Sequence, residues 1–323
     1  MQRRAVGRSG LNVSRMCLGT MTWGRDTDEH EARAQLAAFV EAGGDFIDTA
    51  DVYGDGDSER LLGRILADTG SREELVIATK AVGVTGGERR RDASRRHLLK
   101  ALEDSLQRLG TDHVDLWQMH AWDRQTPIEE TLATLDEAVR SGKARYAGIS
   151  NYSGWQTAQA ATWQAAVPGR VPVVTTQIEY SLLARGVERE VVPAAEAFGM
   201  GLLPWSPLGR GVLTGKYRNG TPADSRGASS HFGGFVQPYL DDRANGIVDA
   251  VITAAHGLQV APLEIALAWI RDRRGVVAPI VGARTAAQLR AALASEALEL
   301  PDEISAALDE VSAPSIAYPE KAF

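Results

Sequence analysis

Short apolar segments recur along the chain and are separated by longer amphipathic ones. Residues 94–109 and 127–140 have apolar positions three and four residues apart, and we expect another helix at 28–42, ended by Gly43 and Gly44. Short apolar strands that alternate with amphipathic helices are typical of a parallel sheet covered by helices. The expected strands are 16–18, 46–48, 75–79, 114–119, 146–149, 173–177, 201–205 and 277–281.

Eight parallel strands can close into a barrel, and an open doubly wound sheet is the alternative. An open sheet usually carries a phosphate-binding G-x-G-x-x-G turn after its first strand. The segment 19–24 (GTMTWG) does not have this spacing. The pattern therefore predicts an α/β fold, a (β/α)8 TIM barrel.

Two further segments flank the expected barrel strands. Residues 1–14 predict a β-hairpin that closes the bottom of the barrel. The segment 206–240 is rich in Gly, Ser and Pro and follows the seventh strand, where a long loop indicates function. We expect one domain over residues 1–323, with a C-terminal helix and tail at 301–323.

Composition and charge exclude several classes of protein. A net charge of −7 disfavours nucleic acid as a partner. One cysteine, Cys17, allows no intrachain disulfide, and the six histidines show no metal-binding spacing, so we expect no metal. We find neither a signal peptide nor an apolar run long enough to span a membrane, so we expect a cytoplasmic protein. The sequence leaves open whether it forms a homo-oligomer.

Four polar residues stand at or just beyond consecutive strand ends. Asp48 ends the second strand, Tyr53 follows it by five residues, Lys80 ends the third and His120 ends the fourth. Active sites of such barrels lie at the carboxyl ends of the strands. Only five of the 35 Lys and Arg residues are lysines, and a lysine leaving an apolar strand needs a partner such as Asp48.

This combination of residues indicates an acid. A tyrosine has a pKa of about 10, and an adjacent ammonium lowers it toward the range useful for general acid catalysis. A histidine beside Tyr53 can donate a hydrogen bond to a substrate oxygen. Reduction of a carbonyl by hydride creates an oxygen that needs such a proton.

The sequence resembles the aldo-keto reductases over nearly its whole length, in particular their bacterial, channel-β-subunit-like branch. Each matching segment is moderately specific, and their order and spacing together are highly specific. The segments are 46–54 (FIDTADVYG), 78–80 (ATK), 115–120 (DLWQMH), 148–151 (GISN), 177–181 (QIEYS), 204–211 (PWSPLGRG) and 281–285 (VGART).

The resemblance implies a catalytic tetrad and an NADPH site. Tyr53 is then the general acid, Lys80 lowers its pKa, Asp48 pairs with Lys80, and His120 orients the carbonyl of an aldehyde or ketone. Trp205 takes the place of the aromatic residue that stacks on the nicotinamide. The implied cofactor-binding residues are Gly19, Thr20, Asp48, Ser150, Asn151, Gln177, Trp205, Ser206, Pro207, Leu208, Gly209, Gly211, Lys216, Arg226, Gly282, Arg284 and Gln288.

Cofactor preference and substrate are less constrained. Arg284 and Arg226 are candidates for the 2′-phosphate of NADPH, but Ala291 and Ala292 replace a Glu-Asn pair that the family often has, which leaves NADH open. Trp23, Trp122, His231 and Phe232 are candidate substrate-pocket residues.

Two other functions remain as alternatives. A barrel lysine can form a Schiff base with a carbonyl, although Asp48 would keep Lys80 charged. The chain can also be an NADP(H)-binding regulatory or sensor subunit with little turnover, as some relatives are subunits of channels.

Overall fold

Eight parallel strands form the centre of the protein. The computed structural model describes residues 1–84, 89–223, 225–229 and 233–315. The strands pair in the order β10-β3-β4-β5-β6-β7-β8-β9, so the sheet follows the chain and β10 lies beside β3. Their bounds are β3 (Cys17–Gly19), β4 (Phe46–Asp48), β5 (Val76–Ala81), β6 (Val114–Met119), β7 (Ala144–Ser150), β8 (Val173–Glu179), β9 (Gly201–Trp205) and β10 (Ile280–Gly282).

The sheet curls into a nearly closed barrel. Between β9 and β10, the two ends of the sheet, Leu202 in β9 forms a parallel bridge with Val276, just before β10. Leu202 donates to the carbonyl of Gly275 and accepts from the amide of Val277, both at 2.9 Å. The strand expected at 277–281 is shifted and shortened, because Pro279 has no N–H to donate to a ladder.

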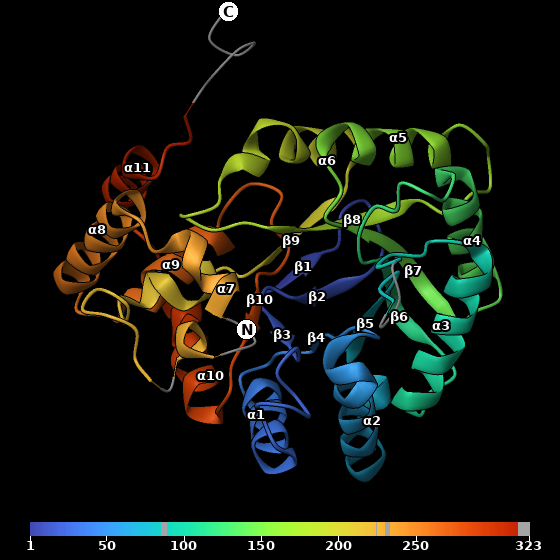
Figure 1. Ribbon diagram of the computed structural model, residues 1–323, viewed down its shortest axis with the longest axis horizontal. Helices are drawn as coiled ribbons and strands as arrows, with labels where there is room; N and C mark the ends of the chain where they lie inside the picture. Colours follow the sequence, from blue (N-terminus) through green and yellow to red (C-terminus); the bar gives the residue numbers. More distant parts are fainter. Residues whose placement is uncertain (85–88, 224, 230–232, 316–323) are drawn as a thin grey trace, which may run out of the picture.

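The helices surround the strands (Figure 1). Among the described residues, no single helix is long and apolar enough to cross a bilayer; α8 and α9 meet the length and composition criteria only as a pair bent by 101°. The helices are α1 (Glu29–Glu41), α2 (Asp57–Thr69), α3 (Arg95–Leu109), α4 (Ile128–Arg140), α5 (Gly154–Ala165), α6 (Val191–Phe198), α7 (Gly233–Val236), α8 (Asp242–Leu258), α9 (Pro262–Arg271), α10 (Ala286–Leu293) and α11 (Asp302–Val311).

Side-chain caps fix several helix starts where the sequence places them. The carboxylate of Asp28 accepts from the amide of Glu31, and the hydroxyl of Ser94 accepts from that of His97. Thr285 caps α10 in the same way. Such caps satisfy amides that the first turn of a helix leaves unpaired.

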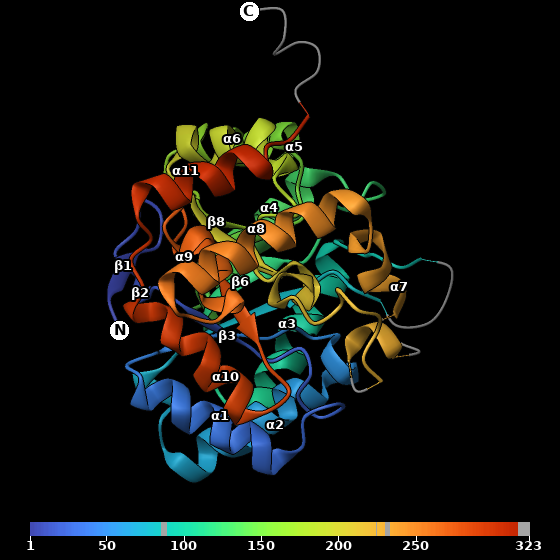
Figure 2. The same ribbon diagram turned by 90° about the vertical axis from the view of Figure 1, so that its left-hand side faces the viewer.

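The N-terminal hairpin closes the bottom of the barrel, as the sequence predicts. Its strands are β1 (Arg3–Ala5) and β2 (Asn12–Ser14). Val6 and Val13 are fully buried in a cluster with inward-facing residues near the amino ends of the strands, among them Phe46 and Leu116. Figure 2 shows the hairpin at one end of the barrel and α7 at the other.

The predicted loop at 206–240 contains short helical segments that its Gly- and Pro-rich composition does not reveal. They are the 3-10 helices η4 (Gly209–Thr214), η5 (Arg226–Ala228) and η6 (Gln237–Tyr239), together with α7. At the other end of the chain, α11 lies within the predicted C-terminal helix.

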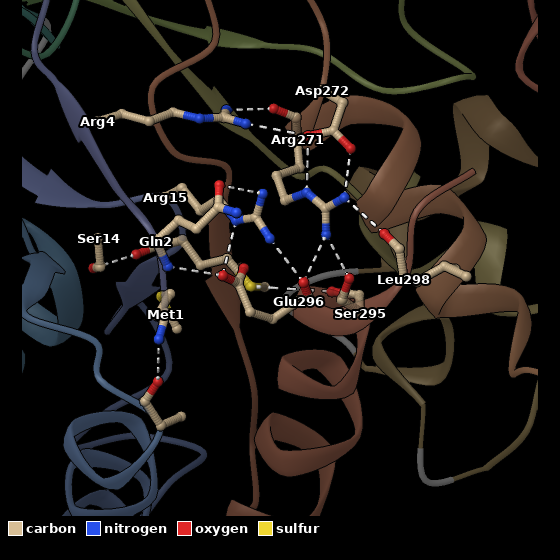
Figure 3. Close-up of polar contacts among 12 residues, drawn as sticks. Met1, Gln2, Arg4, Ser14, Arg15, Arg271, Asp272, Ser295, Glu296 and Leu298 are labelled. Atoms are coloured by element: carbon tan, nitrogen blue, oxygen red, sulfur yellow. Dashed lines mark hydrogen bonds and ion pairs between the residues drawn. The ribbon is translucent and has the colours of Figure 1, made fainter. Parts of the chain in front are cut away.

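A cluster of arginines ties the hairpin to the segment that follows α10 (Figure 3). The buried guanidinium of Arg271 donates to the carbonyls of Ser295, at 2.5 Å, and Leu298, at 2.8 Å. Arg15 donates to the carboxylate and the carbonyl of Glu296, each at 2.8 Å. Arg4 in β1 donates to the carbonyl of Arg271 itself. One network therefore connects the chain's first strand with residues 295–298.

We predict that Arg271→Met lowers the free energy of unfolding by about 3 kcal/mol, because it leaves buried carbonyls without donors. The matched control is Arg290→Met, which removes an exposed pairing with Glu41 and should cost less than about 1 kcal/mol. Urea denaturation measures both. Equal losses in the two variants would contradict the structural role of Arg271.

Candidate active site

The four residues expected at consecutive strand ends meet at the carboxyl end of the barrel. Asp48 is the last residue of β4, Lys80 lies one residue before the end of β5, and His120 follows β6 directly. Tyr53 begins the 3-10 helix η1 (Tyr53–Gly56). The turn that carries Tyr53 is fixed to the next strand, because the amide of Asp51 donates to the carbonyl of Lys80 at 3.1 Å.

The ammonium of Lys80 is the centre of this group. Its Nζ donates to Oδ1 of Asp48 at 2.5 Å, to the carbonyl of Thr49 at 2.8 Å and to the hydroxyl of Tyr53 at 3.2 Å. Lys80 is fully buried and Asp48 is nearly so. Three acceptors match the three donors of an ammonium, so its burial leaves no N–H unpaired.

The second oxygen of Asp48 is held by two amides. Gln177 donates to Oδ2 at 2.9 Å, and Gln118 donates to it at 3.3 Å. Gln118 can reach across the barrel because residue 148 is glycine: a Cβ there would lie 2.2 Å from Oγ1 of Thr175 and 3.0 Å from Cγ of Gln118. Gln118 was not among the site residues predicted from the sequence. It lies in β6, two residues before His120, and alternate residues along a strand point to the same side.

The protonation of Lys80 is strongly favoured. Burial alone would lower its pKa, but the charge of Asp48, the nearby Tyr53 and the hydrogen bonds to both raise it above the ordinary value.

The expectation for Tyr53 needs a correction. Lys80 does pull the pKa of the phenol down, as expected, but burial raises it by more, and Asp48 adds to the rise. The pKa of Tyr53 is therefore raised overall, and the hydroxyl keeps its proton at neutral pH.

His120 is a neutral imidazole in this setting. Burial and the positive charges of Lys80 and Arg91 lower its pKa to about 3. Its ring meets that of Tyr53 edge to face, with centroids 5.9 Å apart. Neutral imidazole carries one N–H, so His120 can donate a single hydrogen bond beside the phenol.

A cavity of about 560 Å³ opens above these residues. Asp48, Tyr53 and His120 line it, while Lys80 is buried beneath them. Most of the expected cofactor residues also line it: Gly19, Asp48, Asn151, Gln177, Trp205, Ser206, Pro207, Leu208, Gly211, Lys216, Gly282, Arg284 and Gln288.

Three expected cofactor residues do not line the cavity. Thr20 is buried, where its hydroxyl contacts Ser58 at 2.8 Å and the carbonyl of Asp48 at 3.1 Å. Ser150 is buried, and its hydroxyl accepts from the side-chain amide nitrogen of Asn151 at 3.1 Å. Gly209 is buried against Leu183. These residues support their neighbours in the cavity wall. The side chain of Arg226 lies outside the described residues.

Asn151 and Trp205 line the cavity side by side. The indole of Trp205 donates to the amide oxygen of Asn151 at 3.0 Å, and the Asn151 amide nitrogen donates to the carbonyl of His120 at 2.9 Å. The backbone of Asn151 has a φ of 58°, a conformation that asparagine tolerates better than most residues.

Arg210 is a cavity residue that the sequence analysis missed. Its guanidinium forms two hydrogen bonds of 2.8 Å to the carboxylate of Glu179 and lies 3.7 Å from the ring centre of Phe235. Phe235 in turn stacks on Trp205, with centroids 6.2 Å apart. Tyr239 donates to the same carboxylate at 2.9 Å. Arg210 thereby fastens the segment 235–239 to the end of β8.

The cavity wall also carries positive charge. Lys216 and Arg284 line it, and the amide oxygen of Gln288 accepts from the backbone N–H of Arg284 at 3.0 Å. Ala291 and Ala292 are also part of the wall, so the wall is apolar at those two positions.

The substrate candidates give a mixed result. Trp23 is fully buried in the core and donates to Gln35 at 3.0 Å, so its proposed contact with substrate is wrong. Trp122 packs edge to face against Tyr152 and Trp155, at centroid distances of 5.1 and 5.4 Å, and does not line the cavity. His231 and Phe232 lie outside the described residues.

Comparison with known proteins identifies the family. The sequence model of the Aldo/keto reductase family matches residues 15–313. The chain belongs to this family, which confirms the resemblance found in its motifs, and the eight-stranded barrel agrees with it.

Individual relatives differ in their described roles. The chain is 37% identical to an uncharacterized oxidoreductase, YrpG, of Bacillus subtilis, over 96% of both chains. It is 37% identical to a probable voltage-gated potassium channel subunit beta of Oryza sativa, over 88% of this chain and 87% of the relative. It is 34% identical to norsolorinic acid reductase stcV of Emericella nidulans, over 91% and 77%. The family, together with the relatives named as an oxidoreductase and a reductase, supports an oxidoreductase activity.

We predict that the imidazole of His120 remains neutral from about pH 8 down to about pH 5, because its pKa is lowered to about 3. Nitrogen-15 NMR of the side chains measures this, with the signal assigned by its loss in His120→Asn. Titration of that signal in the ordinary histidine range, near pH 6.5, would show that the ring is solvated and that its surroundings are not those described.

Proposed function

We propose that this protein is an NADPH-dependent reductase of aldehydes or ketones in which Tyr53 is the general acid. The observation that carries the proposal is the hydrogen-bonded series Asp48–Lys80–Tyr53 at the floor of a cavity that also contains His120. A phenol that keeps its proton, beside a neutral imidazole donor, suits protonation of an oxygen on which charge develops.

Each residue has a defined part in the proposed reaction. When bound, the cofactor supplies the hydride to the carbonyl carbon. His120 donates a hydrogen bond to the carbonyl oxygen and orients it, and Tyr53 donates its proton to that oxygen. Lys80 then stabilises the phenolate across the 3.2 Å contact, and Asp48 holds Lys80 in place.

The residues present fit a dinucleotide. Backbone φ angles are positive at Ser206, Gly209, Arg210 and Gly211, so the chain folds tightly at this edge of the cavity. A Cβ at Gly211 would lie 3.3 Å from Nζ of Lys216, which shows that the ammonium stands directly over this bare backbone. A glycine backbone with one cation is a setting that suits a pyrophosphate. Arg284, which also lines the cavity, is the residue we assign to the 2′-phosphate.

Schiff-base chemistry on Lys80 is disfavoured. An amine must lose its proton to attack a carbonyl, and Lys80 has a raised pKa and donates to three acceptors.

A regulatory role is the second candidate, favoured by the relative described as a probable potassium channel subunit beta. In that case the chain binds NADP(H) but has little turnover. NADPH oxidation measured with a broad panel of aldehydes and ketones separates the two functions, and turnover of any of them favours the enzyme.

We predict that Tyr53→Phe lowers kcat/KM for aldehyde reduction by roughly 10²–10⁴-fold, the usual contribution of a general acid. The dissociation constant of NADPH should be nearly unchanged, because the phenyl ring keeps its shape. Stopped-flow kinetics and cofactor fluorescence measure the two quantities. The matched control is Tyr146→Phe, at the hairpin end of the barrel. Turnover retained in Tyr53→Phe would rule out the assignment.

We also predict that Arg284→Ala weakens NADPH binding by roughly 10- to 100-fold, the effect of losing a charge-assisted hydrogen bond to phosphate. NADH has no 2′-phosphate, so its affinity should change much less. Fluorescence titration with both cofactors tests this, with Arg290→Ala on the exposed face of α10 as the control. An equal loss for NADPH and NADH would place the 2′-phosphate elsewhere.

A further inference from the structure

Carboxylates outnumber cations around the turn that carries Tyr53. Among the described residues that meet at the turn's buried side, three are acids, Asp48, Asp51 and Glu59, and two are cations, Lys80 and Arg108. Asp48 forms an ion pair with Lys80. Arg108 is left to neutralise one of the other two acids.

Glu59 holds Arg108. This residue of α2 is fully buried, and its Oε2 accepts from Nε of Arg108 in α3 at 2.7 Å. Its other oxygen accepts from the hydroxyl of Thr79, next to Lys80, at 2.5 Å. Arg60, also on α2, lies at the surface and pairs with Asp57 at 2.9 Å. Glu59 is therefore a fully satisfied carboxylate.

Asp51 is the acid left without a cation. Its backbone N–H donates a hydrogen bond to the carbonyl of Lys80, which holds the turn between Asp48 and Tyr53 against β5. Its Oδ1 is shielded from solvent and meets no hydrogen-bond donor among the described residues. Asp51 as a whole is half-buried, and its carboxylate takes one backbone hydrogen bond, from Val52. A charged oxygen that is shielded from solvent and accepts no hydrogen bond is costly, and the carboxyl avoids that cost by binding a proton.

The electrostatics agree with this geometry. Burial and the charge of Glu59 raise the pKa of Asp51 to about 7, while a backbone hydrogen bond, Arg108 and Lys80 act in the opposite direction. Ionised Asp51, in turn, raises the pKa of Tyr53.

We propose that Asp51 is a positioning residue of the acid site, a carboxyl that is protonated in the acidic half of the working range and that, once ionised, makes Tyr53 harder to deprotonate. This inference rests on the proposed role of Tyr53 as general acid. Asp51 acts through the electric field at Tyr53 and Lys80 and does not contact the substrate.

The sign of the effect follows from the charges. Below about pH 7 Asp51 is neutral and adds no negative charge near Tyr53. The positive charge of Lys80 then stabilises the phenolate without opposition from Asp51. As the pH rises, Asp51 ionises and the negative charge disfavours the phenolate. Tyr53 therefore keeps its proton to higher pH than it would beside a permanently neutral residue.

The test is the ionisation of Tyr53 in Asp51→Asn, whose amide imitates the protonated acid. Ultraviolet difference titration of the cofactor-free protein, with Tyr53→Phe subtracted, measures the phenol directly. We expect its pKa to fall by roughly one unit, as for one charge removed from partly buried surroundings. The fall of kcat/KM for reduction at high pH should move to lower pH by the same amount. The matched control is Asp55→Asn, an exposed acid on the same turn, which should shift neither quantity.

A second variant tests independently whether Asp51 lacks a counter-ion because Glu59 binds Arg108. It also replaces the first test if Asp51→Asn does not fold. Glu59→Gln frees Arg108 to neutralise Asp51, so the carboxyl should ionise at lower pH. Infrared difference spectroscopy follows the C=O band of the protonated carboxyl, and that band is absent in Asp51→Asn.

The proposal is overturned if the phenol titrates alike in Asp51→Asn and Asp55→Asn, or if Glu59→Gln leaves the carboxyl band unchanged. The phenol titration needs neither cofactor nor substrate. A failure of the proposed reductase activity is therefore distinguishable from a failure of this inference.

Discussion

The burial of one ion pair organises the carboxyl end of the barrel. Removing the charges of Lys80 and Asp48 from water is expensive, and such a pair persists only where its remaining donors and acceptors are all used. Here they are used: Lys80 donates three hydrogen bonds, and Asp48 accepts from Lys80, Gln118 and Gln177. These partners come from β4, β5, β6 and β8, so strands on different sides of the barrel are connected through one carboxylate. The same pair keeps a positive charge beside the hydroxyl of Tyr53.

Much of the fold was readable from the hydrophobic pattern. The strands β4, β6 and β9 begin and end where the apolar segments do, because strands buried on both faces are almost continuously apolar. The hairpin was readable too, because Gly7 and Gly10 mark a turn between its two short strands. Prediction failed where backbone chemistry, or contacts between residues distant in the sequence, determine where an element forms and ends. Pro279 shortened the last strand, and the short helices at 209–239 depend on tertiary partners such as the Arg210–Glu179 pair, which no local pattern reveals.

The cluster of Asp48, Tyr53, Lys80 and His120 was readable from the sequence in its members, but less so in its energetics. Asp48, Lys80 and His120 could be grouped because they lie at the ends of neighbouring strands. The pKa of Tyr53, in contrast, depends on a balance of burial and charge that is set by the three-dimensional arrangement. Gln118 could have been predicted, since it lies in β6 only two residues before His120. Trp23 misled, because an indole that completes a core and one that lines a pocket look alike in a sequence. Arg210 and Phe235 contact each other across 25 positions of the chain, a separation that a single sequence gives no means of pairing.

The hairpin at the bottom of the barrel limits how ligands can reach the cavity. Because Val6 and Val13 fill the amino end, the cavity that reaches Asp48 and Tyr53 opens at the opposite end of the barrel. Two ligands that share one opening enter and leave in series. Of any two such ligands, the one seated deeper has to arrive first and depart last, so an amino end closed by the hairpin constrains the order in which ligands can use the cavity.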